Sequence, residues 1–430
     1  MSVPASHRPL ELWAGPESSV VRVGETWRDQ VRETGHHERG ARDLDLIAGL
    51  GIRTLRYPIL WERTGESQPG AGGWEWHDRQ LETLRGHGIT VAAGLLHHGS
   101  GPRSTSLLDP LLPEKLAVHA AEAAARYPFI RLWTPVNEPL TTARFSCLYG
   151  HWYPHLRDED AFLRAVFLQC RAVLLSMRAI RAHVPDANFL QTEDLGRVFS
   201  TAPLTAQARY ENGRRWLSLD LLCGRVDGTH PWRRRFEQCG ISARDLDELA
   251  TGEAAPDLVG INHYATSDRF LDHRLHLYPQ HLHGGNGRQA YVDTEATRVG
   301  VDQAEVGWTP RLREAWNRYR RPMVISEAHL GCDDPWQQVR WLMEAWNAAR
   351  TLRAEGADLR AVTAWALFGL VDWHVMLRER HDLYEAGAFD ARFDPARPTL
   401  LITAMQALIR DGRFEHPALD EPGWWRAQAG

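Results

Sequence analysis

Eight short apolar segments, each followed by an amphipathic stretch, recur along the whole chain. Short apolar runs are typical of buried strands, and apolar residues spaced three or four apart are typical of helices that pack on one face. The expected strands lie at residues 10–14, 52–59, 89–96, 131–138, 188–193, 257–262, 321–327 and 361–368. The expected helices lie at about 38–50, 76–88, 113–126, 158–183, 205–224, 310–319, 335–356 and 398–410. Eight such units predict an α/β fold of the (β/α)8 TIM-barrel type.

The length of 430 residues, 43% of them hydrophobic, suits either two ordinary domains or one large barrel. No linker separates the eight units, so we expect a single domain over residues 1–430, with long loops at about 140–157 and 265–308. The alternative is a doubly wound open sheet. Such a sheet usually has fewer strands, and no glycine-rich phosphate-binding motif follows the first one.

Charge and cysteine content exclude several classes of function. The net charge of −5 gives no general attraction to nucleic acid or to an anionic membrane. Five cysteines without a CxxC pair argue against a disulfide framework or a zinc site. The histidine pairs have no third metal ligand at a suitable spacing, so we expect no metal and no cofactor. No long apolar segment or signal-peptide pattern occurs, and we expect a cytoplasmic protein. The oligomeric state stays open.

Polar residues gather at the carboxyl ends of the expected strands. In a barrel these ends share one face, so residues far apart in sequence converge there. An isolated strand-end glutamate is as readily a solvated loop residue, but this chain has two, Glu138 and Glu327. The residues at or just beyond strand ends are Arg56, His98, Asn137, Glu138, Tyr264, Glu327, Trp365 and Trp373.

Two facing carboxyl groups suit the hydrolysis of a glycoside with retention of configuration. That reaction needs carboxyls about 5 Å apart, one of which attacks the anomeric carbon while the other protonates the leaving oxygen. We expect Arg56 and Tyr264 to hold Glu327 as the anion. Glu138 is then the acid, its pKa raised by burial and by the charge of Glu327.

The motifs around these residues resemble those of glycoside hydrolase family 1. Trp133-Thr-Pro-Val-Asn-Glu-Pro139 is similar to the family's Thr-x-Asn-Glu-Pro motif, which implies that Glu138 is the acid/base and that Asn137 binds the sugar 2-hydroxyl. Val324-Ile-Ser-Glu327 is similar to the nucleophile strand, which implies that Glu327 is the nucleophile. Leu55-Arg-Tyr-Pro-Ile-Leu-Trp61 and Asp257-Leu-Val-Gly-Ile-Asn-His-Tyr264 resemble the segments whose Arg and Tyr contact it.

The resemblance extends to the sugar contacts, and it covers most of the chain. His98, four residues before Pro102, matches a histidine that binds the glycone. Trp365 and the pair Asp372-Trp373 resemble the family's Trp and Glu-Trp contacts. The resemblance implies small neutral β-glucosides, β-galactosides or β-fucosides as substrates.

Three positions depart from the family pattern. Ala328-His329 follows the nucleophile, where the family has Asn-Gly. The stretch 19–23 lacks the family's glutamine, and Arg22, Glu17 and His329 are candidates for its contact with the glycone. Asp372 is one methylene shorter than the usual glutamate, and its charge would repel a 6-phosphate.

The sequence therefore predicts a retaining β-glycosidase that acts on a small-molecule glycoside. Two alternatives stay open, a carbohydrate-binding or regulatory barrel with vestigial catalysis and a transglycosylase. The presence of both carboxylates with their Asn and Arg partners favours an enzyme over a binding module.

Overall fold

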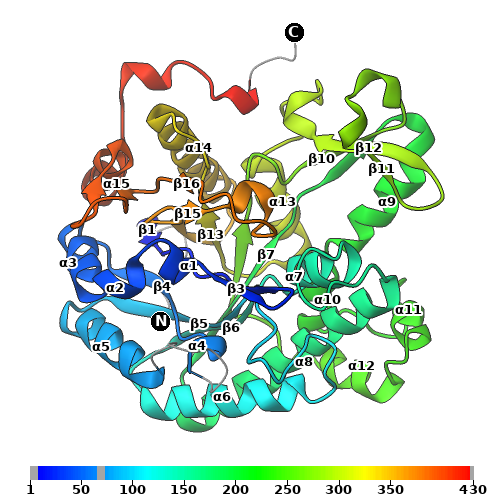
Figure 1. The fold of residues 1–430 in the computed structure, drawn as a ribbon, viewed down its shortest axis with the longest axis horizontal. Helices are drawn as coiled ribbons and strands as arrows, with labels where there is room; N and C mark the ends of the chain where they lie inside the picture. Colours follow the sequence, from blue (N-terminus) through cyan, green and yellow to red (C-terminus); the bar gives the residue numbers. More distant parts are fainter. Residues whose placement is uncertain (1–7, 65–72, 427–430) are drawn as a thin grey trace.

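Eight parallel strands form a closed barrel in the computed structural model, which describes residues 8–64 and 73–426. Their order around the barrel is β1, β14, β13, β9, β7, β6, β5, β4, and β4 pairs with β1 to close the ring. The (β/α)8 prediction is confirmed (Figure 1). The bounds are Glu11–Ala14 (β1), Thr54–Pro58 (β4), Thr90–His97 (β5), Leu132–Asn137 (β6), Asn188–Asp194 (β7), Leu258–Asn262 (β9), Met323–Ala328 (β13) and Leu359–Ala364 (β14).

Helices surround the barrel and connect successive strands. Across residues 8–64 and 73–426, we find no helix whose length and apolar content would let it cross a bilayer. The helices are α1 (Gln30–Glu33), α2 (His36–Arg39), α3 (Ala41–Gly49), α4 (Trp61–Thr64), α5 (Gly73–Gly86), α6 (Leu112–Arg126), α7 (Pro139–Ala143), α8 (Glu159–His183), α9 (Thr205–Arg214), α10 (Leu217–Leu222), α11 (Arg233–Gln238), α12 (Ala243–Ala250), α13 (Trp308–Tyr319), α14 (Pro335–Ala354) and α15 (Leu400–Asp411).

Local signals set where the longest helices begin. The side chain of Asp158 caps α8 by accepting a hydrogen bond from the backbone N–H of Ala161 at 2.7 Å. Asp334 caps α14 in the same way, and Pro335 occupies the first turn, where a missing N–H costs nothing. These two helices pack on β6 and β14, respectively.

One layer of side chains fills the barrel interior. It contains one buried residue from each of seven strands, because alternate side chains of a strand face the barrel axis. Trp13 is its largest member. The layer consists of Trp13, Ala92, Leu132, Leu190, Leu258, Val324 and Ala361.

The predicted strand at 361–368 ends early. β14 stops at Ala364, and Ala366 has a φ of 55°, so the chain turns there and leaves Trp365 just beyond the strand. The predicted helix at 205–224 is likewise two helices, α9 and α10. The break at Arg215 lets its guanidinium reach the backbone of Leu195 and the carboxylate of Glu314.

The two predicted loops contain regular structure. Residues 265–308 include β10 (Arg269–Asp272), β11 (His283–Gly285) and β12 (Ala290–Glu295), which form a four-stranded sheet with β8 (Val198–Ser200). The prediction of a long loop is wrong there, because β10 pairs with β12, β12 pairs with β11, and β10 also pairs with β8 from a distant segment. Residues 140–157 include most of α7 and a π-helical turn, η2 (Arg144–Leu148).

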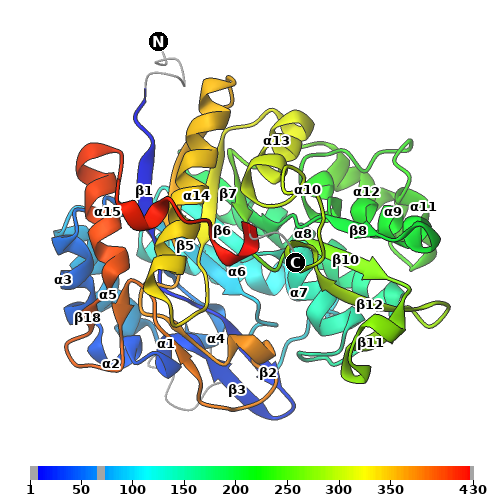
Figure 2. The ribbon, with the colours of Figure 1, turned by 90° about the horizontal axis from the view of Figure 1, so that it is seen from above.

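Figure 2 shows how these additions lie around the barrel mouth. β1 runs from the N-terminus toward the side that carries the hairpin of β2 (Val20–Val23) and β3 (Thr26–Asp29). The small sheet of β10, β11 and β12 extends outward beside it. The strand carboxyl ends therefore open among long connections rather than short turns.

A buried ion pair holds the small sheet to the barrel. Arg311 of α13 is fully buried and donates to Asp268 at 3.1 Å and to the carbonyl of Glu305. Asp268 also accepts from the backbone N–H groups of Arg197 and Gly307.

We expect Arg311→Met to lower the free energy of unfolding by about 3–5 kcal/mol, because it leaves the buried Asp268 carboxylate without its cation. Chemical denaturation measures this. Arg313→Met is the matched control, since Arg313 pairs with Glu355 in an exposed contact and should cost less than about 1 kcal/mol. Equal losses in the two variants would contradict this account.

Candidate active site

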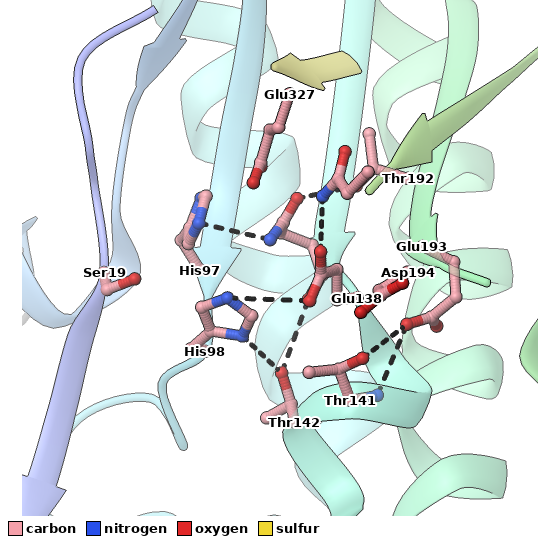
Figure 3. Close-up of polar contacts among 12 residues, drawn as sticks. Ser19, His97, His98, Glu138, Thr141, Thr142, Thr192, Glu193, Asp194 and Glu327 are labelled. Carbon is pink, nitrogen blue, oxygen red and sulfur yellow. Dashed lines mark hydrogen bonds and ion pairs between the residues drawn. The ribbon is translucent and has the colours of Figure 1, made fainter. Parts of the chain in front are cut away.

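Glu138 and Glu327 lie at the same end of the barrel and face a common space (Figure 3). Glu138 directly follows β6 and has a left-handed backbone, with φ 46°, that starts α7. Glu327 lies within β13, one residue before the strand ends. Their side chains are 3% and 2% exposed. The two residues, 189 positions apart by subtraction of their numbers, are thus brought together by the barrel.

Glu327 is held by a cation and a phenol. Arg56 Nη1 donates to Glu327 Oε1 at 2.8 Å and to the carbonyl of Ser326 at 2.6 Å. The hydroxyl of Tyr264 donates to Glu327 Oε2. Both carboxylate oxygens therefore accept a hydrogen bond, as the sequence predicts for Arg56 and Tyr264.

Glu138 has only neutral partners. Asn262 Nδ2 donates to its Oε1 at 2.5 Å, and His98 Nε2 lies 3.8 Å from its Oε2. Asn262 ends β9, two residues before Tyr264, and sequence reasoning did not include it among the site residues. Its place in the matched strand motif, at a strand end, was the available signal.

The two carboxyl groups differ in how easily they ionise. Burial, then the charges of Glu327, Glu193 and Asp194, raise the pKa of Glu138 well above its usual range. Burial raises the pKa of Glu327 to about 7, and Arg56 and Tyr264 oppose that rise. Glu138 is thus the group that keeps its proton, and Glu327 is the one that ionises first.

Asn137 is oriented by three neighbours. Its Oδ1 accepts from Arg56 Nη2 at 2.9 Å and from Thr192 Oγ1 at 2.7 Å. Its Nδ2 lies 3.1 Å from His97 Nε2 and donates to it. The amide is fixed beside both glutamates, where the predicted contact with a sugar hydroxyl can be made.

The two histidines after β5 have different surroundings. His97 contacts Asn137 and lies 3.8 Å from Glu17, whereas His98 faces Glu138 and Thr142. The sequence prediction singled out His98 from its distance to Pro102. The structure adds His97 to the residues around the site, because it contacts Asn137.

Trp365, Glu17 and Trp373 form further walls of the site. Trp365 Nε1 donates to Glu17 Oε2 at 3.0 Å, and its ring stacks on His97 with centroids 5.6 Å apart. Glu17 Oε1 accepts from Ser19, both backbone and hydroxyl, and from the Ser18 backbone. Trp373 packs on His98, and its buried Nε1 has no hydrogen-bond partner among the described residues.

Asp372 is an anchor of its own loop. Its fully buried carboxylate accepts hydrogen bonds from Arg28 and from the backbone N–H groups of His381, Asp382 and Leu383. Burial raises its pKa, but these donors outweigh burial and bring the pKa below its usual range. The geometry does not support its predicted contact with a sugar, because its acceptors are used within the chain.

Of the other candidates, Arg22 stacks on the ring of Tyr153 at 3.2 Å and donates to the carbonyl of Arg103, so it lies in the rim. His329 is buried, and its Nε2 has no partner within residues 8–64 and 73–426. Burial lowers the pKa of His329 to about 4. Neither contacts the two glutamates by a hydrogen bond in the described residues.

Glu193 supports the start of α7, next to Glu138. It lies one residue before the end of β7 and accepts from the backbone N–H groups of Leu140 and Thr141 and from the hydroxyls of Thr141 and Ser218. It therefore caps α7, the helix that Glu138 starts (Figure 3). No group of three or more His, Cys, Asp or Glu side chains suited to a metal occurs in the part of the chain that the structure describes.

The raised pKa of Glu327 predicts a pH-dependent gain in stability for Glu327→Gln. Below about pH 4.5 the carboxyl is neutral in both folded and unfolded chains, so the variant and the wild type should match. Between about pH 4.5 and 7 the unfolded chain ionises first, which destabilises the wild type. Above pH 7 the variant should be more stable by about 3 kcal/mol. Thermal unfolding at pH 5 and 8 measures this, and a difference independent of pH would contradict it.

Known proteins resemble this chain in sequence and in structure. The sequence profile described as glycosyl hydrolase family 1 matches residues 23–388. β-Glucosidase A of Thermotoga maritima is 28% identical over 79% of this chain and 78% of its own. An aryl-phospho-β-D-glucosidase of Bacillus subtilis is 21% identical over 79% of this chain and 78% of its own.

A solved structure gives the same fold. The β-glucosidase from Thermotoga maritima in complex with deoxynojirimycin superposes with a TM-score of 0.74, at 17% identity, over 94% of this chain and 98% of the other. The family profile covers most of the chain and includes the strands that carry Arg56, Glu138 and Glu327. The chain therefore belongs to glycosyl hydrolase family 1, and it is a glycoside hydrolase.

Proposed function

We propose that this enzyme hydrolyses small neutral β-glycosides with retention, through Glu327 as nucleophile and Glu138 as acid/base. The observation that carries the proposal is the unequal setting of two buried carboxyls that face one space. Glu327 has a cation and a phenol as partners, whereas Glu138 has only neutral ones. Retaining hydrolysis needs one ionised and one protonated carboxyl in such a pair.

In the first step, a carboxylate oxygen of Glu327 forms a bond to the anomeric carbon while the bond to the leaving oxygen breaks. Glu138 gives its proton to that oxygen. Arg56 and Tyr264 keep Glu327 in place for the attack. Asn137, held by Arg56 and Thr192, is the side chain best oriented to bind the neighbouring sugar hydroxyl.

In the second step, Glu138 is ionised and takes a proton from water as the water oxygen attacks the anomeric carbon. The bond to Glu327 breaks, and the carboxylate returns to Arg56 and Tyr264. Two displacements at the same carbon restore the β configuration.

We infer a neutral glycone from the charges around the site. In the described part of the chain, Arg56 is the only cation that contacts Glu138, Glu327 or Asn137 by a hydrogen bond or ion pair. Asp372, whose charge suggested the same conclusion from the sequence, is instead paired with Arg28. We also propose a cytoplasmic location, which the five unpaired cysteines support.

Azide rescue tests the two roles separately. Glu327→Gly should lose more than about 10⁴-fold in turnover of an aryl β-glycoside. Azide should restore turnover and give the α-glycosyl azide, because it attacks from the side that Glu327 leaves. Glu138→Ala should give the β-glycosyl azide, since its covalent intermediate still forms. NMR of the products distinguishes the two.

Glu344→Gln is the control, because Glu344 lies on α14 and its hydrogen-bond partners are Trp425 and Arg426 rather than residues of the site. It should turn over normally with or without azide. A wild type that cleaves no β-glycoside, or two variants that give the same azide anomer, would refute the proposal.

The glycone inference predicts a preference among substrates. Nitrophenyl β-glucoside, β-galactoside or β-fucoside should exceed the matching 6-phosphate by at least about tenfold in kcat/KM, because the phosphate meets carboxylates without a free cation. Parallel initial rates with each pair measure this. A preference for the phosphorylated sugar would remove the neutral-glycone inference while leaving the two glutamates in their roles.

A further inference from the structure

His98 lies directly against the proposed acid. Its Nε2 is 3.8 Å from Glu138 Oε2, and its Nδ1 is 3.0 Å from Thr142 Oγ1 (Figure 3). The ring is 6% exposed and packs on Trp152 and Trp373, with centroids 5.3 and 5.8 Å away. A side chain enclosed in this way is held in one orientation.

The imidazole of His98 is neutral at ordinary pH. Burial, and then the charge of Arg56, lower the pKa of His98 to about 3. Its contact with Glu138 is therefore not an ion pair. A neutral imidazole has one N–H donor and one acceptor nitrogen, so the tautomer decides what Glu138 faces.

Thr142 sets the tautomer. Its hydroxyl can donate to the carbonyl of Asn137, 3.5 Å away, and then accepts from Nδ1–H of His98. Nε2 is left as the acceptor, and it points at Glu138 Oε2.

The hydrogen bonds of Asn262 place the proton of Glu138 on that same oxygen. Ser326 Oγ donates to Asn262 Oδ1 at 2.5 Å, which fixes the amide so that Nδ2 faces Glu138. Nδ2 donates to Oε1, so Oε1 is an acceptor. The proton of the acid is therefore on Oε2, opposite the lone pair of His98.

We propose that His98 is a positioning residue for Glu138, accepting a hydrogen bond from its protonated Oε2 through Nε2. The inference rests on the proposed role of Glu138 as acid/base. The distance of 3.8 Å between His98 Nε2 and Glu138 Oε2 is longer than a hydrogen bond. A rotation about χ3 of Glu138, which has a broad energy minimum, brings the two atoms within hydrogen-bond distance.

This contact acts in both steps. Before the first step it favours the protonated acid until the leaving oxygen replaces Nε2 as the acceptor. After proton transfer the lone pair of Nε2 faces a carboxylate, which makes Glu138 a stronger base toward water. His98 itself gains and loses no proton.

The backbone agrees with a specific role at this point. His98 and Glu138 directly follow the paired strands β5 and β6, and both have left-handed backbones, with φ of 58° and 46°. Such conformations are unfavourable for residues other than glycine and gather at functional sites. Of the nine non-glycine residues with positive φ in the described part of the chain, these two face each other.

His98→Phe tests the proposal, because it keeps the ring between Trp152 and Trp373 and removes both nitrogens. The basic limb of kcat/KM against pH, which reports the acid of the free enzyme, should move down by about one pH unit. Aryl β-glycosides with poor leaving groups should lose about tenfold, and dinitrophenyl substrates should change little. The other groups that act on Glu138, namely Glu327, Glu193, Asp194 and Asn262, are unchanged.

Two further variants complete the test. Thr142→Val removes the hydroxyl that accepts from His98 Nδ1–H, so either tautomer of His98 can form. The basic limb should again move down, and this variant serves as the test if His98→Phe does not fold. His97→Phe removes the contact to Asn137 and should raise KM without moving the basic limb.

The outcomes separate the two proposals. A wild type without β-glycosidase activity refutes the proposed function. An active wild type whose basic limb stays in place in folded His98→Phe and in Thr142→Val refutes the role of His98. Equal losses of kcat/KM for substrates with good and poor leaving groups in His98→Phe would also refute this role, because they would indicate that His98 contacts the sugar.

Discussion

The buried guanidinium of Arg56 is the interaction on which the arrangement of the site depends. It leaves β4, reaches Glu327 and the backbone of Ser326 on β13, and reaches Asn137 at the end of β6. Its face lies 4.4 Å from the ring of Trp365 beyond β14. One cation thus joins four parts of the barrel rim. Because the same guanidinium donates to β13 and to the end of β6, it holds the nucleophile and the barrel ends in one geometry.

The barrel and the main residues of the site could be predicted from the sequence because both depend on local patterns. The spacing of apolar residues that marks strands and helices can be seen in the sequence alone, and closure of the barrel then brings the strand ends together. Glu327, Arg56, Asn137 and Tyr264 are linked by hydrogen bonds, and Glu138 faces the same space, since each lies in or just beyond a barrel strand. Their distance in sequence mattered little once the topology was known.

Features that depend on a distant partner could not be predicted. Within residues 265–308, β10 pairs with the distant β8, which ties the local strands β11 and β12 into one sheet. The motif before Pro102 pointed to His98 alone, and only the strand register shows that His97 lies opposite Asn137. Asp372 matches a sugar contact in sequence, yet Arg28 and three backbone N–H groups occupy its carboxylate. In each case a long-range contact outweighed the local pattern.

The central claim is that Glu327 attacks the anomeric carbon while Glu138 supplies the proton. A 2-deoxy-2-fluoro β-glycoside with a dinitrophenyl leaving group tests it most directly, because fluorine slows both steps and the good leaving group lets only the first proceed. Peptide mass spectrometry of the inactivated enzyme should find one sugar bound to Glu327. A sugar bound to another residue, or turnover of a β-glycoside substrate without any covalent adduct, would contradict the account.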